Sequence, residues 1–157
     1  MKIKRKATPS TSAPVTAFWD TSGIVPLCCV QDASVRARQV ARTYARQVVW
    51  WGTVVEAISA FYRLAREGHA TAKEVRQASD RLEYLRERWN EVQPTEDVRH
   101  RAERLLAAHR LRAADALQLA GALVWCANRP RSRFFVCADG DLSNAAEREG
   151  FTAITLL

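Results

Sequence analysis

Short apolar runs rich in β-branched and aromatic residues alternate with longer segments of helical periodicity along most of this chain. The apolar runs, which we predict to be strands, cover residues 15–20, 47–51, 90–94, 132–139 and 151–157. The predicted helices between them cover residues 21–30, 33–46, 53–66, 71–89, 95–109, 113–128 and 142–149. Strands separated by helices favour a parallel sheet with helices on both faces. We therefore expect an α/β protein with a mainly parallel central sheet.

The length of 157 residues suits one domain with a sizeable core, which we expect to span residues 16–157. Residues 1–15 are basic, then rich in Pro, Ser and Thr, and we expect a disordered lead there. No apolar stretch follows the basic residues, so this lead is not expected to be a signal peptide. The longest apolar run, near residues 113–127, contains Gln118 and is too short to span a bilayer. We expect a cytoplasmic protein without membrane contact.

The net charge of +7 is a weak indication of a polyanionic partner. Four of the positive charges lie between residues 2 and 6, and removing them leaves +3, which is ordinary for a domain. The four cysteines lack the spacing of a zinc site, and we expect buried free thiols of a reduced compartment. Solvated surface positions are expected for the three histidines, His69, His100 and His109. The tryptophans expected in the core or in dimer contacts are Trp50, Trp51, Trp89 and Trp125.

Four carboxylates occupy related positions in the predicted elements. Asp20 and Asp139 each end a predicted strand. Glu56 lies in the first turn of the helix after the second strand, and Asp115 lies near the start of the helix over 113–128. Ligands of parallel α/β sheets bind beyond the carboxyl ends of the strands. We expect these residues, called the four acids below, to lie at that edge.

Helix capping is an alternative explanation for each acid taken alone. Asp20 precedes Thr21 and Ser22 in the position of an N-cap. Thr53 and Glu56 have the spacing of a capping box. Asp115 suits the positive end of a helix dipole, and Asp141 suits the cap of the helix that follows it. These alternatives remain open at the level of single residues.

The four acids together favour a metal site. Carboxylates gathered at one edge repel one another, and their pKa values rise unless a cation is present. Mg²⁺ prefers hard oxygen ligands, and Mn²⁺ tolerates the same set. A metal-bound water is a better nucleophile, and the cation neutralises charge on a phosphoryl oxygen. The predicted chemistry is phosphodiester hydrolysis, which needs no nucleophilic Ser or Cys.

Four stretches carry the acids in order: FWDTSGIVPL, TVVEAISAFYRL, LRAADALQLAGAL and FVCADGDLSNAAEREGF. Together they resemble the PIN-domain family of metal-dependent ribonucleases, above all the VapC-type toxins of toxin–antitoxin pairs. The resemblance covers residues 15–157. It implies a three-layer α/β/α fold, an RNA substrate, a cognate antitoxin that inhibits the enzyme, and a homodimer. It also implies that Mg²⁺ or Mn²⁺ is held by the catalytic residues Asp20, Glu56, Asp115 and Asp139.

The resemblance is weakest around the fourth acid. Family members often have a hydroxyl residue two positions before it, where this chain has Cys137. Asp139 fits the spacing best, and Asp141 is a second or alternative ligand. Thr21 or Ser22 is expected to orient a metal-bound water. The basic lead is not part of the family pattern.

Three other families are excluded by missing residues. A haloacid-dehalogenase-like phosphatase needs a second Asp two residues after the first, where Ser22 stands. A receiver domain needs a Lys near the last strands, and no Lys follows Lys73. A nucleotide-binding domain needs a Gly-rich phosphate loop, which is absent. The alternative that remains is a catalytically silent PIN-like module that binds RNA or protein.

Overall fold

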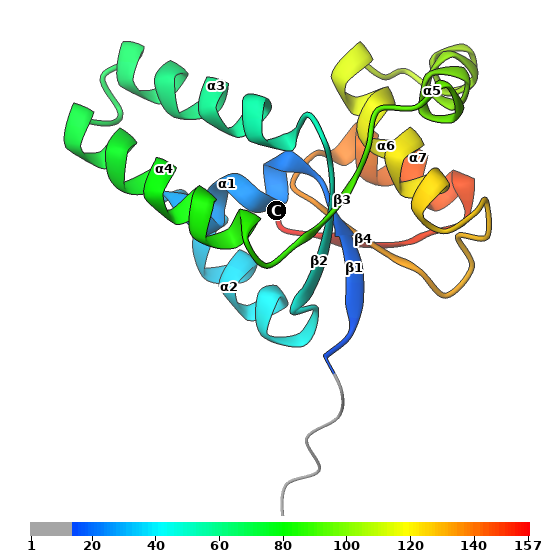
Figure 1. Cartoon of the computed structure of the whole chain (residues 1–157), viewed down its shortest axis with the longest axis horizontal. Helices are drawn as coiled ribbons and strands as arrows, with labels where there is room; N and C mark the ends of the chain where they lie inside the picture. Colours follow the sequence, from blue (N-terminus) through cyan, green and yellow to red (C-terminus); the bar gives the residue numbers. More distant parts are fainter. Residues whose placement is uncertain (1–13) are drawn as a thin grey trace, which may run out of the picture.

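A computed structural model describes residues 14–157, which contain one five-stranded sheet (Figure 1). Its strands are β1 (Thr16–Trp19), β2 (Arg46–Trp50), β3 (Asn90–Val92), β4 (Phe134–Cys137) and β5 (Thr152–Thr155). Their order across the sheet is β3-β2-β1-β4-β5, and every neighbouring pair is parallel. The predicted parallel sheet is therefore confirmed. The predicted disordered lead covers residues 1–15, and residues 1–13 of it lie outside the described part of the chain.

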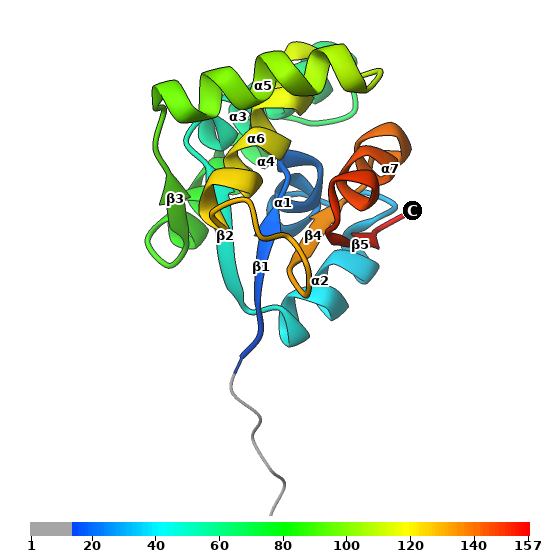
Figure 2. The same cartoon turned by 90° about the vertical axis from the view of Figure 1, so that its right-hand side faces the viewer.

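Seven helices in the described residues cover the two faces of the sheet (Figures 1 and 2). One face carries α1 (Thr21–Cys28), α2 (Ser34–Thr43), α3 (Thr53–Arg66) and α4 (Ala72–Arg86). The other carries α5 (Glu96–Ala108), α6 (Ala113–Trp125) and α7 (Gly140–Glu149). This is the three-layer α/β/α arrangement, and each predicted strand and helix is present with ends shifted by a few residues.

Alternation along β1 divides the core into two parts. Phe18 faces the α5–α7 layer, where its ring stacks on Phe135 with 5.5 Å between centroids. Ala17 and Trp19 face the α1–α4 layer. Successive side chains of a strand point to opposite faces, so a short apolar run with no polar residue fits a strand buried on both sides.

Gly23 allows α1 to pack closely over the centre of the sheet. A Cβ atom at this position would lie 3.2 Å from Cε3 of Trp19 and 3.3 Å from the carbonyl oxygen of Val136. Since such contacts are tighter than ordinary packing, glycine brings the start of α1 near β1 and β4. The backbone N–H of Asp20 donates to the same Val136 carbonyl at 2.9 Å.

The expectations for the tryptophans and cysteines hold in part. Trp50 and Trp89 are buried, and the half-buried Trp125 packs against the core. Trp51 is 50% exposed and is therefore not a core residue. All four cysteines are free thiols, two of them buried and two half-buried. Within residues 14–157 no helix has both the length and the apolar character needed to cross a bilayer.

Candidate active site

The strand order places two of the four acids on adjacent strands. From β1 the chain builds β2 and β3 on one side of the sheet and then β4 and β5 on the other. Asp20 follows β1 and Asp139 follows soon after β4. Open parallel sheets form a crevice where the strand order reverses in this way.

A cleft of about 720 Å³ opens at this edge. The four acids all line it: Asp20, Glu56, Asp115 and Asp139. Thr21 and Ser22 also line it. Asp141 does not; it lines an adjoining hollow of about 670 Å³, called the side hollow below, which it shares with Asp115 and Asp139. The structure thus brings the four acids to one cleft and leaves Asp141 beside it.

Asp20 is the most buried of these acids, at 5% exposed. It is the N-cap of α1, and its carboxylate accepts hydrogen bonds from the backbone N–H (2.8 Å) and the hydroxyl of Ser22. The Ser22 hydroxyl also accepts a hydrogen bond from the backbone N–H of Ala138 at 2.8 Å, so it connects Asp20 to the end of β4. Burial, together with the nearby charge of Asp115, raises the pKa of Asp20 from its ordinary 3.8 to about 6.

Glu56 does not form the capping box that its spacing suggests. The N-cap of α3 is Gly52, whose added Cβ would lie 2.5 Å from Nε1 of Trp50, and no side chain in the described part of the chain caps this helix. Glu56 Oε2 instead accepts a hydrogen bond from Nε2 of Gln118 at 3.2 Å. Burial raises the pKa of Glu56, and the charge of Asp20 adds to this rise.

Asp115 and Asp139 also lie at helix starts. Asp115 is the third residue of α6, and its carboxylate accepts a hydrogen bond from the backbone N–H of Arg112 at 3.3 Å. Burial raises the pKa of Asp115, and the neighbouring Asp139 contributes. Asp139 is the N-cap of α7 and accepts from the N–H of Leu142 at 2.7 Å. The expectation that Asp141 caps this helix is wrong, because the helix begins earlier and Asp141 lies in its first turn.

Capping and membership of the site are therefore compatible. Helices that follow parallel strands begin at the carboxyl edge of the sheet, so residues at their starts meet there. Of the four acids, Asp20 and Asp139 are N-caps, and Asp115 accepts an N-cap N–H. The same hydrogen bonds that start the helices fix where these carboxylates stand.

The chemistry of the donor set fits a hard divalent cation. The cleft offers the four acids and a fifth carboxylate, that of the exposed Asp32, which sequence reasoning did not single out. For Asp20, Glu56 and Asp115 burial and mutual repulsion raise the pKa, which a cation would reverse. Among residues 14–157, no group of three or more His, Cys, Asp or Glu side chains is already arranged to hold a metal ion. The side chains would have to turn toward one another on binding.

Gln118 is a site residue that sequence reasoning missed. It is fully buried on α6, one turn after Asp115, and contacts Glu56. In the sequence it is a single amide within an apolar run, which gives no signal of its contacts. Only its hydrogen bonds to the first residues of α1 and α3 and to Glu56 reveal its place in the site.

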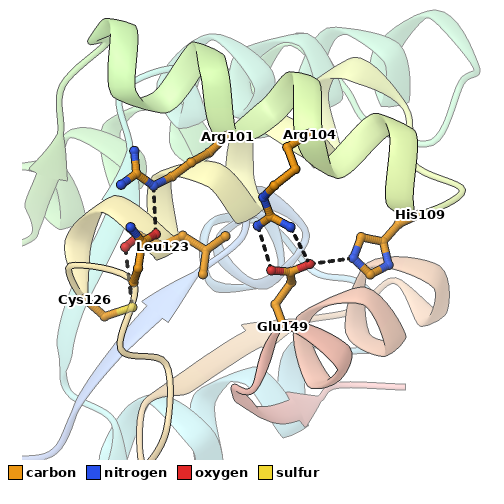
Figure 3. Close-up of polar contacts among 7 residues, drawn as sticks. Arg101, Arg104, His109, Leu123, Cys126 and Glu149 are labelled. Carbon is orange, nitrogen blue, oxygen red and sulfur yellow. Dashed lines mark hydrogen bonds and ion pairs between the residues drawn. The ribbon is translucent and has the colours of Figure 1, made fainter.

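A salt bridge and a hydrogen bond behind the site join α5 to α7 (Figure 3). The carboxylate of Glu149 accepts two bonds from Arg104, at 3.1 and 2.7 Å, and lies 2.8 Å from Nε2 of His109. The His109 side chain is only 8% exposed, so the expected solvated position is wrong for this histidine. His109 directly precedes the segment that leads to Asp115. These contacts join that segment to α7, whose N-cap is Asp139.

Comparison with known proteins supports the fold. No protein-family model matches the sequence, and no curated protein matches it. A solved structure described as a toxin–antitoxin complex from Klebsiella pneumoniae superposes with a TM-score of 0.60. The match covers 90% of this chain and 98% of the other chain, at 14% sequence identity. At that identity the likeness establishes a common chain fold.

Proposed function

We propose that this protein is a metal-dependent endoribonuclease of the PIN-domain type, acting as a VapC-like toxin that a cognate antitoxin neutralises. The observation that carries the proposal is the meeting of the four acids in one cleft at the reversal of strand order. The similar fold in a structure described as a toxin–antitoxin complex supports the toxin role. An intracellular RNA target would place the protein in the cytoplasm.

Mg²⁺ or Mn²⁺ bound at the four acids would supply an activated water and neutralise charge on the scissile phosphate. Asp20, Glu56, Asp115 and Asp139 would hold the ion. Asp20 must lose its proton to do so, and its raised pKa is close enough to neutrality that the ion can displace that proton. The Ser22 hydroxyl keeps the Asp20 carboxylate oriented, and Thr21 lies beside it at the cleft wall.

Exposed arginines around the acids support a polyanionic substrate. Arg63 lines the cleft on the α3 side. Arg110 and Arg112 line the side hollow next to Asp115 and Asp139. Arginine binds phosphate oxygens with paired donors, and such contacts make nucleic-acid affinity depend on salt. A strand of RNA laid across the acids would meet arginines on both sides.

Apolar surface near the site supports the two proposed protein partners. The cleft has an apolar wall that includes Val55, which is 67% exposed, and Pro26. An antitoxin segment with apolar side chains and a basic group would fit this wall and the acids beside it. Trp51 and Tyr62, each about half exposed, offer aromatic surface for a second copy of the chain.

A silent module that binds RNA or protein without cleaving it is the second candidate. It is favoured by the fact that no metal-binding group is preformed among residues 14–157. The two candidates differ in catalysis, since only the nuclease predicts RNA cleavage that requires a metal ion.

The deciding experiment incubates the full chain with single-stranded and structured RNA in Mg²⁺, Mn²⁺ or EDTA. We expect the wild type to cleave RNA only when Mg²⁺ or Mn²⁺ is present. In Asp115→Asn we expect the cleavage rate to fall by more than the roughly 10- to 100-fold that is typical when a residue next to a metal ligand is changed. Asn preserves the shape of the helix start, so its melting temperature should stay near that of the wild type. Asp80→Asn, an exposed change on α4 away from the cleft, is the charge-matched control and should cleave normally.

Two results would contradict the nuclease. One is wild-type protein that binds RNA without cleaving any of it in either metal. The other is Asp115→Asn cleaving at the rate of Asp80→Asn.

A further inference from the structure

A single buried amide connects the parts of the site. Nε2 of Gln118 lies 2.7 Å from Oγ1 of Thr21, 3.3 Å from Oγ1 of Thr53 and 3.2 Å from Oε2 of Glu56. The Gln118 side chain is fully buried, Thr53 is also 0% exposed and Thr21 is 7% exposed. The contact is therefore a polar cluster enclosed beneath the cleft.

The partners of Gln118 lie at the starts of two other helices. Thr21 is the first residue of α1 and directly follows Asp20. Thr53 is the first residue of α3, one turn before Glu56. Gln118 itself lies one turn after Asp115 on α6. One amide thus joins the three helix starts that carry Asp20, Glu56 and Asp115.

This amide is an unfavourable choice for core packing alone. A side-chain amide has two N–H donors, so it cannot bond fully to three acceptors at once. Its Oε1 atom is buried and has no hydrogen-bond partner among residues 14–157. A buried polar atom without a partner destabilises the folded state. The next residue, Leu119, is a fully buried apolar residue on the same helix, and an unbranched apolar side chain would also fill the volume at position 118.

We propose that Gln118 is a positioning residue for the metal centre: its amide holds the Glu56 carboxylate and the start of α1 at the separation the ion requires. The inference rests on the proposed metal-dependent function. Side chains that donate a hydrogen bond to a ligating carboxylate orient it, and their removal weakens metal binding without removing a ligand.

Gln118→Met removes both N–H donors and the unpaired oxygen while keeping the side-chain length. Without metal, we expect its melting temperature to stay within about 4 °C of the wild type, because lost hydrogen bonds and the lost unpaired oxygen offset each other. Mn²⁺ affinity, measured by calorimetric titration of the full chain, should fall about 10- to 100-fold. In RNA cleavage at saturating Mn²⁺, kcat should fall while KM for RNA changes little.

Leu119→Met is the matched control for a methionine in the core of α6. It should keep wild-type Mn²⁺ affinity. Glu56→Gln provides the second test, since Gln118 is proposed to act largely through Glu56. Adding Gln118→Met to Glu56→Gln should lower Mn²⁺ affinity by much less than it does in the wild-type background.

Three outcomes would overturn the inference. Mn²⁺ affinity of Gln118→Met within about 3-fold of Leu119→Met shows that the amide does not position the site, because outer-shell losses are at least about 10-fold. If the losses of Mn²⁺ affinity in Gln118→Met and Glu56→Gln add fully in the double variant, the Gln118 amide does not act through Glu56. Failure of both Gln118→Met and Gln118→Leu to fold shows a structural role. In each case wild-type Mn²⁺ binding and RNA cleavage would survive, whereas their absence would refute the proposed function and this inference with it.

Discussion

The two sides of the cleft differ in how their acids are held. On the inner side, Asp20 is almost fully buried and Glu56 is half-buried, and each accepts hydrogen bonds from neighbouring side chains. On the outer side, Asp139 is exposed at the cleft and Asp141 is exposed in the side hollow next to it, and Asp139 is held by the backbone N–H that it caps. Arginines lie beside the outer acids in the side hollow. Under the proposed function, the inner side would set the geometry of the ion and the outer side would meet the substrate.

Burial also separates the two sides electrostatically. Desolvation raises the pKa of both inner acids, so the proposed cation would gain most from interacting with them. Charges on the exposed side are screened by water and salt. Substitutions should therefore have effects that decrease from the inner to the outer side.

The largest effect is expected from Asp20→Asn. An asparagine caps α1 as well as an aspartate does, but it carries no charge for the ion. We expect loss of detectable metal-dependent cleavage. In metal-free protein at pH 7 the variant should melt at a higher temperature than the wild type. The buried charge that it removes destabilises the folded state by about 3 kcal/mol, given 1.36 kcal/mol per pKa unit. Calorimetry in EDTA measures this difference, and a lower melting temperature would contradict the inner-side account.

A smaller effect is expected from Asp139→Asn, and Asp141→Asn should have the least. Both positions are exposed at the start of α7, and asparagine preserves the cap at 139. Asp139 lines the cleft and Asp141 lines only the hollows beside it. We expect Mn²⁺ affinity to fall at least about 10-fold in Asp139→Asn, as is typical of changes around a metal ligand. In Asp141→Asn it should fall less than about 3-fold, below that range. The reverse ranking would make Asp141 the fourth ligand.

The smallest effect on catalysis is expected from the outer arginines. Replacing Arg110 and Arg112 by serine should weaken RNA binding and reduce the slope of log affinity against log salt by about 1 to 2, since each phosphate contact contributes about 0.7 to 0.9. Mn²⁺ binding should not weaken, because the double variant removes the positive charge of Arg112 beside Asp115. The matched control replaces Arg36 and Arg38 on α2, which line none of the described pockets near the acids. Equal salt slopes in the two double variants would exclude a specific contact at the side hollow.

The fold could be predicted from the sequence because its central strands β1, β2 and β4 are buried on both faces. Runs such as FFVC have no polar face, and the helices between them have clear apolar spacing. The meeting of the four acids followed from the same pattern, since parallel strands end at one edge. The sequence did not reveal whether Glu56 caps its own helix. In the structure Gly52 takes the N-cap position, and Gln118 on α6 holds the Glu56 carboxylate instead.

Contacts between distant segments account for what the sequence did not reveal. Gln118 and Thr21 are 97 positions apart, and His109 and Glu149 are 40 positions apart. Neither pair has a periodicity or a motif that marks it. Local patterns predicted the helix starts to within about two residues, whereas the side chains that connect the helix starts depend on tertiary packing.

The pH dependence of stabilisation by Mn²⁺ tests the central claim that the four acids jointly bind a cation. The pKa of Asp20 is raised from 3.8 to about 6, so its contribution to metal-free stability is present below pH 4 and is lost as the pH rises through 6. Mn²⁺ binding must displace these protons and should therefore stabilise the protein little at pH 5. At pH 7.5, with Mn²⁺ at 100 times its dissociation constant, we expect the melting temperature to rise by about 5–10 °C. No rise at pH 7.5, or the same rise at both pH values and in Asp20→Asn, would contradict the account.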